Sequence, residues 1–214
     1  MYDPWDGMRV LNPGFGRKRF SAIEVRDITI AISVLTVAIF IILYRGSNLV
    51  PNDAVNNFLA ILGLSFLLVV TGFMIHELAH KYVAQKYGAW AEFRVYPQGL
   101  LMALVFSLLG FLFAAPGAVY INGAIDQERN GKISAAGPAS NMVIAAIASI
   151  MWFMTDGLTS QIFGLFAFVN AFFAVFNLLP IPPMDGSKIY RWNMPLYIFM
   201  FAGAVAMLIP QFFF

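Results

Sequence analysis

The chain has 214 residues, of which 60% are hydrophobic and only 11% are charged, and its formal net charge is +2. This composition excludes a water-soluble globular protein, and so small a net charge gives no reason to expect a nucleic-acid partner. The sequence contains no cysteine, so any metal site must use histidine, aspartate or glutamate. We therefore expect an integral membrane protein embedded in the lipid bilayer.

Six apolar stretches approach the roughly 20 residues that a helix needs to cross a bilayer. They cover residues 28–44, 58–75, 99–121, 133–154, 162–181 and 194–214. The residues before the first stretch are mixed in character, and we predict that residues 1–27 form a cytoplasmic N-terminal segment. The remaining residues, 28–214, are predicted to form one membrane-embedded domain.

The second apolar stretch leads into His76-Glu77-Leu78-Ala79-His80, which contains the two histidines of the chain. Positions i and i+4 share one face of a helix, so both imidazoles can bind a single metal ion. Glu77 then borders the open coordination position, where a carboxylate can act as a general base. The motif therefore predicts two metal ligands and a base.

The third stretch, residues 99–121, is predicted not to cross the membrane. A strand-like segment at residues 91–96 precedes it, and Gly110 and residues 115–118 interrupt it. We interpret this region as a re-entrant hairpin or a strand pair. The predicted fold is an all-α polytopic membrane protein with about five transmembrane helices, six being the alternative, and a short β element after the HExxH helix.

Asp185 is the candidate for a third metal ligand, since a catalytic zinc usually has three protein ligands. It follows the fifth apolar stretch and a run of prolines that ends the helix, and Gly186 after it permits a tight turn. Such a turn can direct the carboxylate back towards the metal. The alternative is a turn or N-cap residue that faces water. The other acidic residues lie in predicted loops or in the N-terminal segment and fit less well.

These motifs together resemble the site-2 protease family of intramembrane zinc metalloproteases. The resemblance rests on the HExxH motif paired with the later run NLLPIPPMDG at residues 177–186, and Gly137-Pro138 also fits, so it extends over about residues 56–190. It implies one Zn²⁺ per chain bound by His76, His80 and Asp185. It also implies Glu77 as the general base and Asn177 as a polar group near the substrate backbone. We expect the compact form of the family, without PDZ or CBS domains.

The function that this resemblance implies is hydrolysis of peptide bonds within transmembrane segments of membrane-protein substrates. Three alternatives stay open: a zinc protease that acts on juxtamembrane or soluble peptides, a metal transporter, and an inactive membrane-protein binding module. A transporter should offer ligands along a path through several helices, whereas these ligands converge on one site. An inactive relative should have lost Glu77 or a ligand. The sequence does not indicate the oligomeric state.

A transmembrane substrate must unwind before its peptide bonds can be attacked, and unwound backbone is costly in lipid. An exposed edge in the 91–122 region could bind the unwound segment by strand addition, the alternative being a packed membrane hairpin. Water must also reach the metal. Four polar residues could line its path from the cytoplasm or instead bond to neighbouring helices. They are Thr71, Asn141, Asn170 and Asn177.

The membrane topology follows from the ligand positions and the basic residues. The HExxH motif and Asp185 lie at the ends of two different helices, and these ends must face the same side of the membrane. With five spans and the N-terminus inside, 12 of the 13 lysines and arginines lie inside and Arg45 lies outside, whereas six spans give 8 against 5. We therefore expect the N-terminus and the active site towards the cytoplasm and the C-terminus outside.

Overall fold

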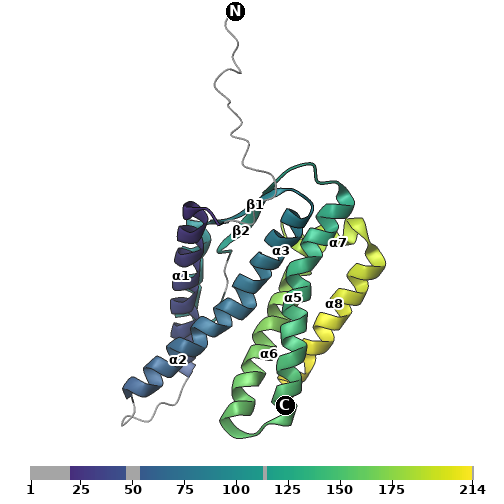
Figure 1. Cartoon of the computed structure of the whole chain (residues 1–214). Coiled ribbons are helices and arrows are strands. Elements are labelled where there is room, and N and C mark those ends of the chain that lie inside the picture. Colours follow the sequence, from purple (N-terminus) through teal and green to yellow (C-terminus); the bar gives the residue numbers. More distant parts are fainter. Residues whose placement is uncertain (1–19, 47–53, 113–114, 214) are drawn as a thin grey trace, which may run out of the picture.

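Five long apolar helical segments dominate the computed structural model, which describes residues 20–46, 54–112 and 115–213 (Figure 1). All five are long and apolar enough to cross a membrane. The prediction of five spans is therefore confirmed. The segments comprise α1 (Ala22–Gly46), the continuous path of α2 (Ala54–Val69), η2 (Val70–Met74) and α3 (Ile75–Lys86), α5 (Gln127–Met154), α6 (Gly157–Asn177), and α8 (Met194–Leu208) with η3 (Ile209–Phe212).

The segment after the HExxH helix contains the predicted strand pair. Strand β1 (Trp90–Val95) pairs antiparallel with β2 (Gly117–Asn122), and α4 (Pro97–Leu108) connects them. At 1.5 Å per residue, the 12 residues of α4 reach only about 18 Å, which is too short to cross a bilayer. The non-spanning interpretation of residues 99–121 is therefore confirmed.

Helices α5 and α6 pack closely because small residues lie where they meet. Ala145 and Ala148 on α5, and Ala167 and Ala171 on α6, are 0–5% exposed. Small side chains allow two helix backbones to approach each other, which is how helices associate in a membrane where lipid is as apolar as leucine. The close packing fixes α5 beside α6, and α3 packs on α5 in turn.

Helix α1 begins at Ala22, six residues before the first predicted apolar stretch. The helix therefore includes Glu24 and Asp27, which belong to the predicted N-terminal segment, residues 1–27. Glu24 is fully buried, and its Oε2 lies 2.5 Å from Lys81 Nζ. An unpaired buried carboxylate would be strongly destabilising, and the partners Lys81 and Phe93 N offset the cost of burying Glu24 within α1.

The elements that carry the predicted site residues meet at one end of the molecule. The C-terminal end of α3, the small sheet, the start of α5 and the short helix α7 (Asp185–Trp192) all lie at this end, whereas the C-terminus of the chain lies at the other (Figure 1). Gln127 Nε2 on α5 donates to Arg191 O on α7 at 2.5 Å, which ties these two elements together. The chain topology thus brings residues 76–80 and 185 to the same end.

Candidate metal centre

The two histidines project from one face of α3. Their rings are almost perpendicular, their Nε2 atoms are 3.0 Å apart, and both residues are buried. The π-helical segment η2 immediately precedes α3, and there the hydrogen bonding changes to i→i+5, with Ile75 N donating to Val70 O. Such a turn rotates the following residues relative to a regular helix, and π-turns often occur at functional sites.

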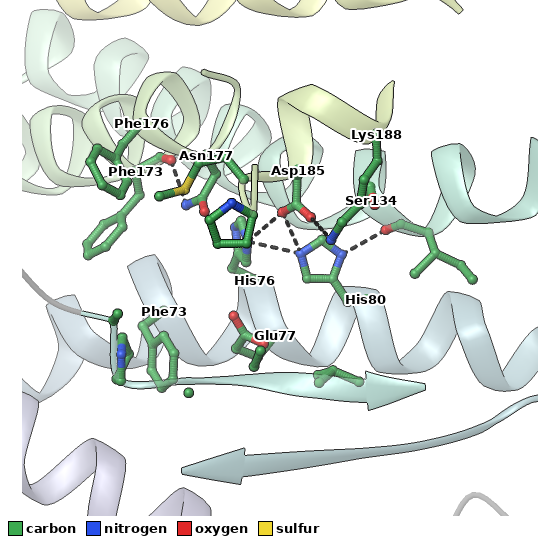
Figure 2. Close-up of a pocket in the computed structure, with 18 of the residues that line it drawn as sticks. Phe73, His76, Glu77, His80, Ser134, Phe173, Phe176, Asn177, Asp185 and Lys188 are labelled. Carbon is green, nitrogen blue, oxygen red and sulfur yellow. Dashed lines mark hydrogen bonds and ion pairs between the residues drawn. The ribbon is translucent and has the colours of Figure 1, made fainter. Parts of the chain in front are cut away.

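Asp185 approaches the histidines from the start of α7. Its Oδ2 lies 3.0 Å from His80 Nε2 and 3.4 Å from His76 Nε2, as Figure 2 shows. Gly186 makes this approach possible, since a Cβ at that position would lie 2.1 Å from the carbonyl oxygen of Leu178. Asp185 is thus no turn residue facing water: it is buried and points at the two imidazoles.

The charge of Asp185 is set by its neighbours. Burial alone would raise the pKa of this carboxyl group, but His80 and His76 together lower it below the ordinary value. Lys188, one helical turn further along α7, places its Nζ 3.5 Å from Asp185 Oδ1. Asp185 therefore directs Oδ2 at the histidines and Oδ1 at a lysine.

The outer nitrogens of both imidazoles have acceptors of their own. His80 Nδ1 lies 2.7 Å from Ile133 O, and His76 Nδ1 lies 2.5 Å from Asn141 Oδ1. A carbonyl oxygen can only accept, so the Nδ1 of His80 donates its proton, and in the neutral ring that a metal requires Nε2 carries the lone pair. Metal-binding histidines are usually held in this way.

These three side chains fit a tetrahedral zinc ion. Their ligand atoms all lie within 4.8 Å of one another, and ligands at about 2.1 Å from a tetrahedral zinc would be about 3.4 Å apart. Gly137 on α5 leaves the required space, because a Cβ there would lie 2.3 Å from His80 Nε2 and 2.6 Å from His76 Nε2. In the part of the chain that the structure describes, no other group of three His, Asp or Glu side chains has this geometry.

Glu77 lies beside this cluster, on the side of the small sheet (Figure 2). It is buried, and it lines the same cavity as Val119 of β2. A cavity of about 230 Å³ adjoins Glu77 and the three candidate ligands, and residues of α3, β2, α5, α6 and α7 line it. A carboxylate next to the candidate metal position and a cavity is the geometry that a general base requires.

The four polar residues considered for a water path have different environments. Asn177 lines the cavity, and its Nδ2 donates to Phe173 O at 2.9 Å within α6. Thr71 bonds to carbonyl oxygens of its own helix. Asn141 and Asn170 are fully buried and bonded to each other. For Asn141 and Asn170 the alternative of bonding between helices therefore holds, whereas Asn177 faces the cavity.

Comparison with known proteins gives the family. Residues 154–195, which include Asp185, match the model of peptidase family M50. The chain is 44% identical to "Putative zinc metalloprotease MJ0611" of Methanocaldococcus jannaschii, over 82% of this chain and 87% of that protein. The chain belongs to peptidase family M50. It is a zinc metalloprotease and a membrane protein, as the resemblance to site-2 proteases implied.

Two further relatives have lower sequence identity. "Putative zinc metalloprotease YwhC" of Bacillus subtilis is 31% identical over 59% of this chain and 67% of that protein. "Zinc metalloprotease MJ0392" of Methanocaldococcus jannaschii is 28% identical over 73% of this chain but only 40% of that protein. No solved structure matches this M50 chain significantly. The family assignment leaves no support for the transporter and the inactive binding module.

Proposed function

We propose that this M50 protease hydrolyses peptide bonds within transmembrane segments of membrane-protein substrates. The observation that carries the proposal is the position of the site: the ligand cluster and Glu77 face a cavity among helices long and apolar enough to cross a membrane. A strand edge borders the same cavity. One Zn²⁺ per chain is bound by His76, His80 and Asp185, with Glu77 as the general base.

The chemistry assigned to the chain is proton transfer and positioning. When bound, zinc polarises the scissile carbonyl group and lowers the pKa of water at the open position. The carboxylate of Glu77 accepts the proton that water releases as its oxygen bonds to the carbonyl carbon. Glu77 then gives this proton to the amide nitrogen as the C–N bond breaks. Asn177, on the cavity wall, is proposed to bind the substrate backbone.

The outer edge of β1 is closed by side chains. Phe93 N donates to Glu24 Oε1 at 3.0 Å, and Val95 N lies 3.4 Å from Asp27 Oδ2. Gln85 on α3 donates to the carbonyl oxygen of Ala91 at 3.3 Å. Side chains that occupy backbone groups in this way prevent another strand from pairing with an edge. A substrate strand therefore cannot add beside β1 without displacing α1.

The edge of β2 is the one that borders the cavity. Phe93 pairs with Val119 and Val95 with Gly117 in the antiparallel ladder. Because the N–H groups of Phe93 and Val95 point away from β2, the backbone groups of their partners point away from β1. Gly117, Val119 and Ile121 all line the cavity. We propose that an unwound substrate segment pairs with these three residues and so lies extended beside the candidate metal position.

The strand-addition proposal predicts a defect in Val119→Pro. Proline removes the amide at the edge of β2 without removing a hydrogen bond between β1 and β2. The hydrogen bond that this amide would donate to the substrate is worth about 1 kcal/mol, so kcat/KM should fall by roughly 3- to 10-fold. Val119→Ala is the matched control, because it shortens the same side chain and keeps the amide. Equal kcat/KM values for the two variants on a transmembrane substrate would refute strand addition at β2.

The proposed topology has the site end of the molecule towards the cytoplasm and the C-terminus outside. Described basic residues lie mainly at the site end, whereas Arg45 lies at the opposite end of α1. The N-terminal segment contributes Arg17, Lys18 and Arg19, which lie outside the described residues. An excess of lysine and arginine on the cytoplasmic side supports this orientation. The proposed partners are the lipid bilayer and a transmembrane substrate.

Cysteine labelling tests the topology directly, because the natural chain has no thiol. Arg129→Cys lies at the start of α5 and Asp156→Cys in the turn before α6, and both positions are exposed. In intact cells a membrane-impermeant maleimide should label the residue-156 variant, and it should label the residue-129 variant only after permeabilisation. Labelling of the residue-129 variant in intact cells would reverse the orientation.

The location of the cut distinguishes the proposed function from a protease of juxtamembrane or soluble peptides. Purified protein in detergent is incubated with a panel of single-span membrane proteins and with soluble peptides that carry their flanking sequences, with and without a chelator. Mass spectrometry of the products should place the cut inside the apolar segment, and the chelator should prevent it. Cuts confined to flanking or soluble sequences would favour the alternative.

A further inference from the structure

Asn141, in the middle of α5, uses its whole side chain in hydrogen bonds between helices. It is fully buried, and its Nδ2 donates to Gly72 O at 2.8 Å and to Asn170 Oδ1 at 3.0 Å. Its Oδ1 lies 2.5 Å from His76 Nδ1. Asn141 thus links α5 to α6, to the π-helical segment and to a proposed metal ligand.

The donor and acceptor in each of these connected hydrogen bonds follow from the bond of Asn170, which is the most distant from His76. Asn170 Nδ2 donates to the carbonyl oxygen of Phe166, which can only accept, so Asn170 must present Oδ1 to Asn141. Asn141 in turn must present Nδ2 to Asn170 and to the carbonyl oxygen of Gly72. Its Oδ1 is therefore left facing His76. An amide oxygen can only accept, so Nδ1 of His76 carries a proton, and in the neutral ring that a metal requires the lone pair lies on Nε2, which faces Asp185.

The π-helical segment supplies one of the anchors. Gly72 lies within it, packed against α6 so tightly that a Cβ would lie 3.1 Å from the ring of Phe173. Its carbonyl oxygen accepts from Asn141 four residues before His76. The same asparagine therefore contacts the backbone that precedes His76 and the ring of His76 itself. Any shift of α3 along α5 would break both contacts together.

The two histidines differ in how they are held. His80 donates to a backbone carbonyl, that of Ile133, which no substitution removes. His76 depends on a side chain. We propose that Asn141, supported by Asn170, is a positioning residue that fixes the tautomer and orientation of His76 for metal binding. This inference rests on the proposed role of His76 as a ligand.

A purely structural role for Asn141 makes a different prediction. If the side chain only holds α5 against its neighbours, Asn141→Asp and Asn141→Leu should be similarly harmful, since both lose the two donated bonds. If it positions His76, Asn141→Asp should be much milder, because a carboxylate still accepts from Nδ1 of the imidazole. Asn141→Leu has a similar volume and no acceptor. Comparison of the two variants therefore separates positioning from packing.

The test measures zinc affinity and the state of each histidine in the full-length protein. Zinc affinity is obtained by competition with a chromophoric chelator. In protein labelled with ¹⁵N-histidine the ring signals come from only two imidazoles, each with an Nδ1 and an Nε2, since the chain has only two histidines. Ser65→Ala serves as the control, because Ser65 is fully buried but bonds only within its own helix, to Ile61 O at 2.7 Å.

The expected results are specific to His76. In zinc-loaded wild-type protein both rings should carry their proton on Nδ1. Asn141→Leu should weaken zinc binding by about 10- to 100-fold and speed proton exchange at Nδ1 of His76 but not of His80. The zinc affinity of Asn141→Asp should stay within a few-fold of the wild-type value, and that of Ser65→Ala should equal the wild-type value.

Four outcomes would overturn the inference. Zinc binding to His76 through Nδ1 in the wild type would contradict the tautomer, and equal losses in Asn141→Leu and Asn141→Asp would show a packing role. Unchanged zinc affinity in Asn141→Leu, with zinc lost in His76→Ala, would overturn the positioning role and leave the ligand assignment intact. Zinc retained in His76→Ala would overturn the ligand assignment as well.

Discussion

Glu77→Gln is expected to lower peptide hydrolysis by about 100- to 10,000-fold while zinc stays bound, because an amide cannot accept the proton that water releases. The three proposed ligands do not include Glu77, so the metal site keeps its donors. Glutamine also has nearly the same shape as glutamate, so the packing against β2 should survive. The measurements are single-turnover cleavage of a transmembrane substrate and the zinc content of the same preparation.

A matched control for this substitution lies at the start of α5. Glu128→Gln makes the same chemical change at an exposed position, where Glu128 pairs with Lys132 at 2.5 Å on the helix surface. An exposed pair of this kind contributes little to stability. The cleavage rate of Glu128→Gln should therefore equal that of the wild type. Near-normal cleavage by Glu77→Gln would exclude Glu77 as the base.

Gly137→Ala is expected to abolish zinc binding and activity together. The added methyl group would lie 2.3 Å from His80 Nε2 and 2.6 Å from His76 Nε2, in the space between the proposed ligands. Neither imidazole can retreat easily, since Ile133 O and Asn141 hold their other nitrogens. We expect zinc affinity to fall by more than the roughly 100-fold that is typical when a supporting residue is removed.

The control for the added methyl group is Gly63→Ala. Gly63 lies in α2, and a Cβ there has no atom within 4 Å, so the variant should bind zinc and cleave substrate as the wild type does. Alanine is also the better helix former of the two residues. Zinc content by atomic spectroscopy and helix content by circular dichroism are measured for both variants. Full zinc occupancy in Gly137→Ala would show that the metal binds elsewhere.

Some of this architecture could be predicted from local sequence alone. The number of spans follows from the lengths of apolar runs, because a bilayer demands about 20 apolar residues from each helix. The strand followed from the strand-like residues 91–96, and the non-spanning stretch from Gly110 and the break at residues 115–118. The grouping of His76 with His80 followed from helical periodicity, since an i, i+4 spacing fixes one face wherever the helix lies.

Other features could be seen in the sequence, but their structural role could not be inferred from it. Glu24 and Asp27 fall within the predicted N-terminal segment, residues 1–27, but lie in α1 in the structure. Their partners, Lys81 and the edge of β1, are distant in sequence, so only the folded chain shows why α1 can begin before them. Asn141 was noticed as a polar residue in an apolar helix, but its contact with His76 spans 65 residues.

By itself, the sequence determined which residues are available for the chemistry: two histidines at helical spacing, a glutamate between them and an aspartate after a proline-rich turn. The tertiary structure alone decided that Asp185 Oδ2 lies within 3.4 Å of both Nε2 atoms, that Gly137 leaves the space between the ligands, and that β2 borders the cavity. The physical reason is that periodicity and apolar length act within one element. Distances between α3, α5 and α7 depend instead on how buried small residues let whole helices pack.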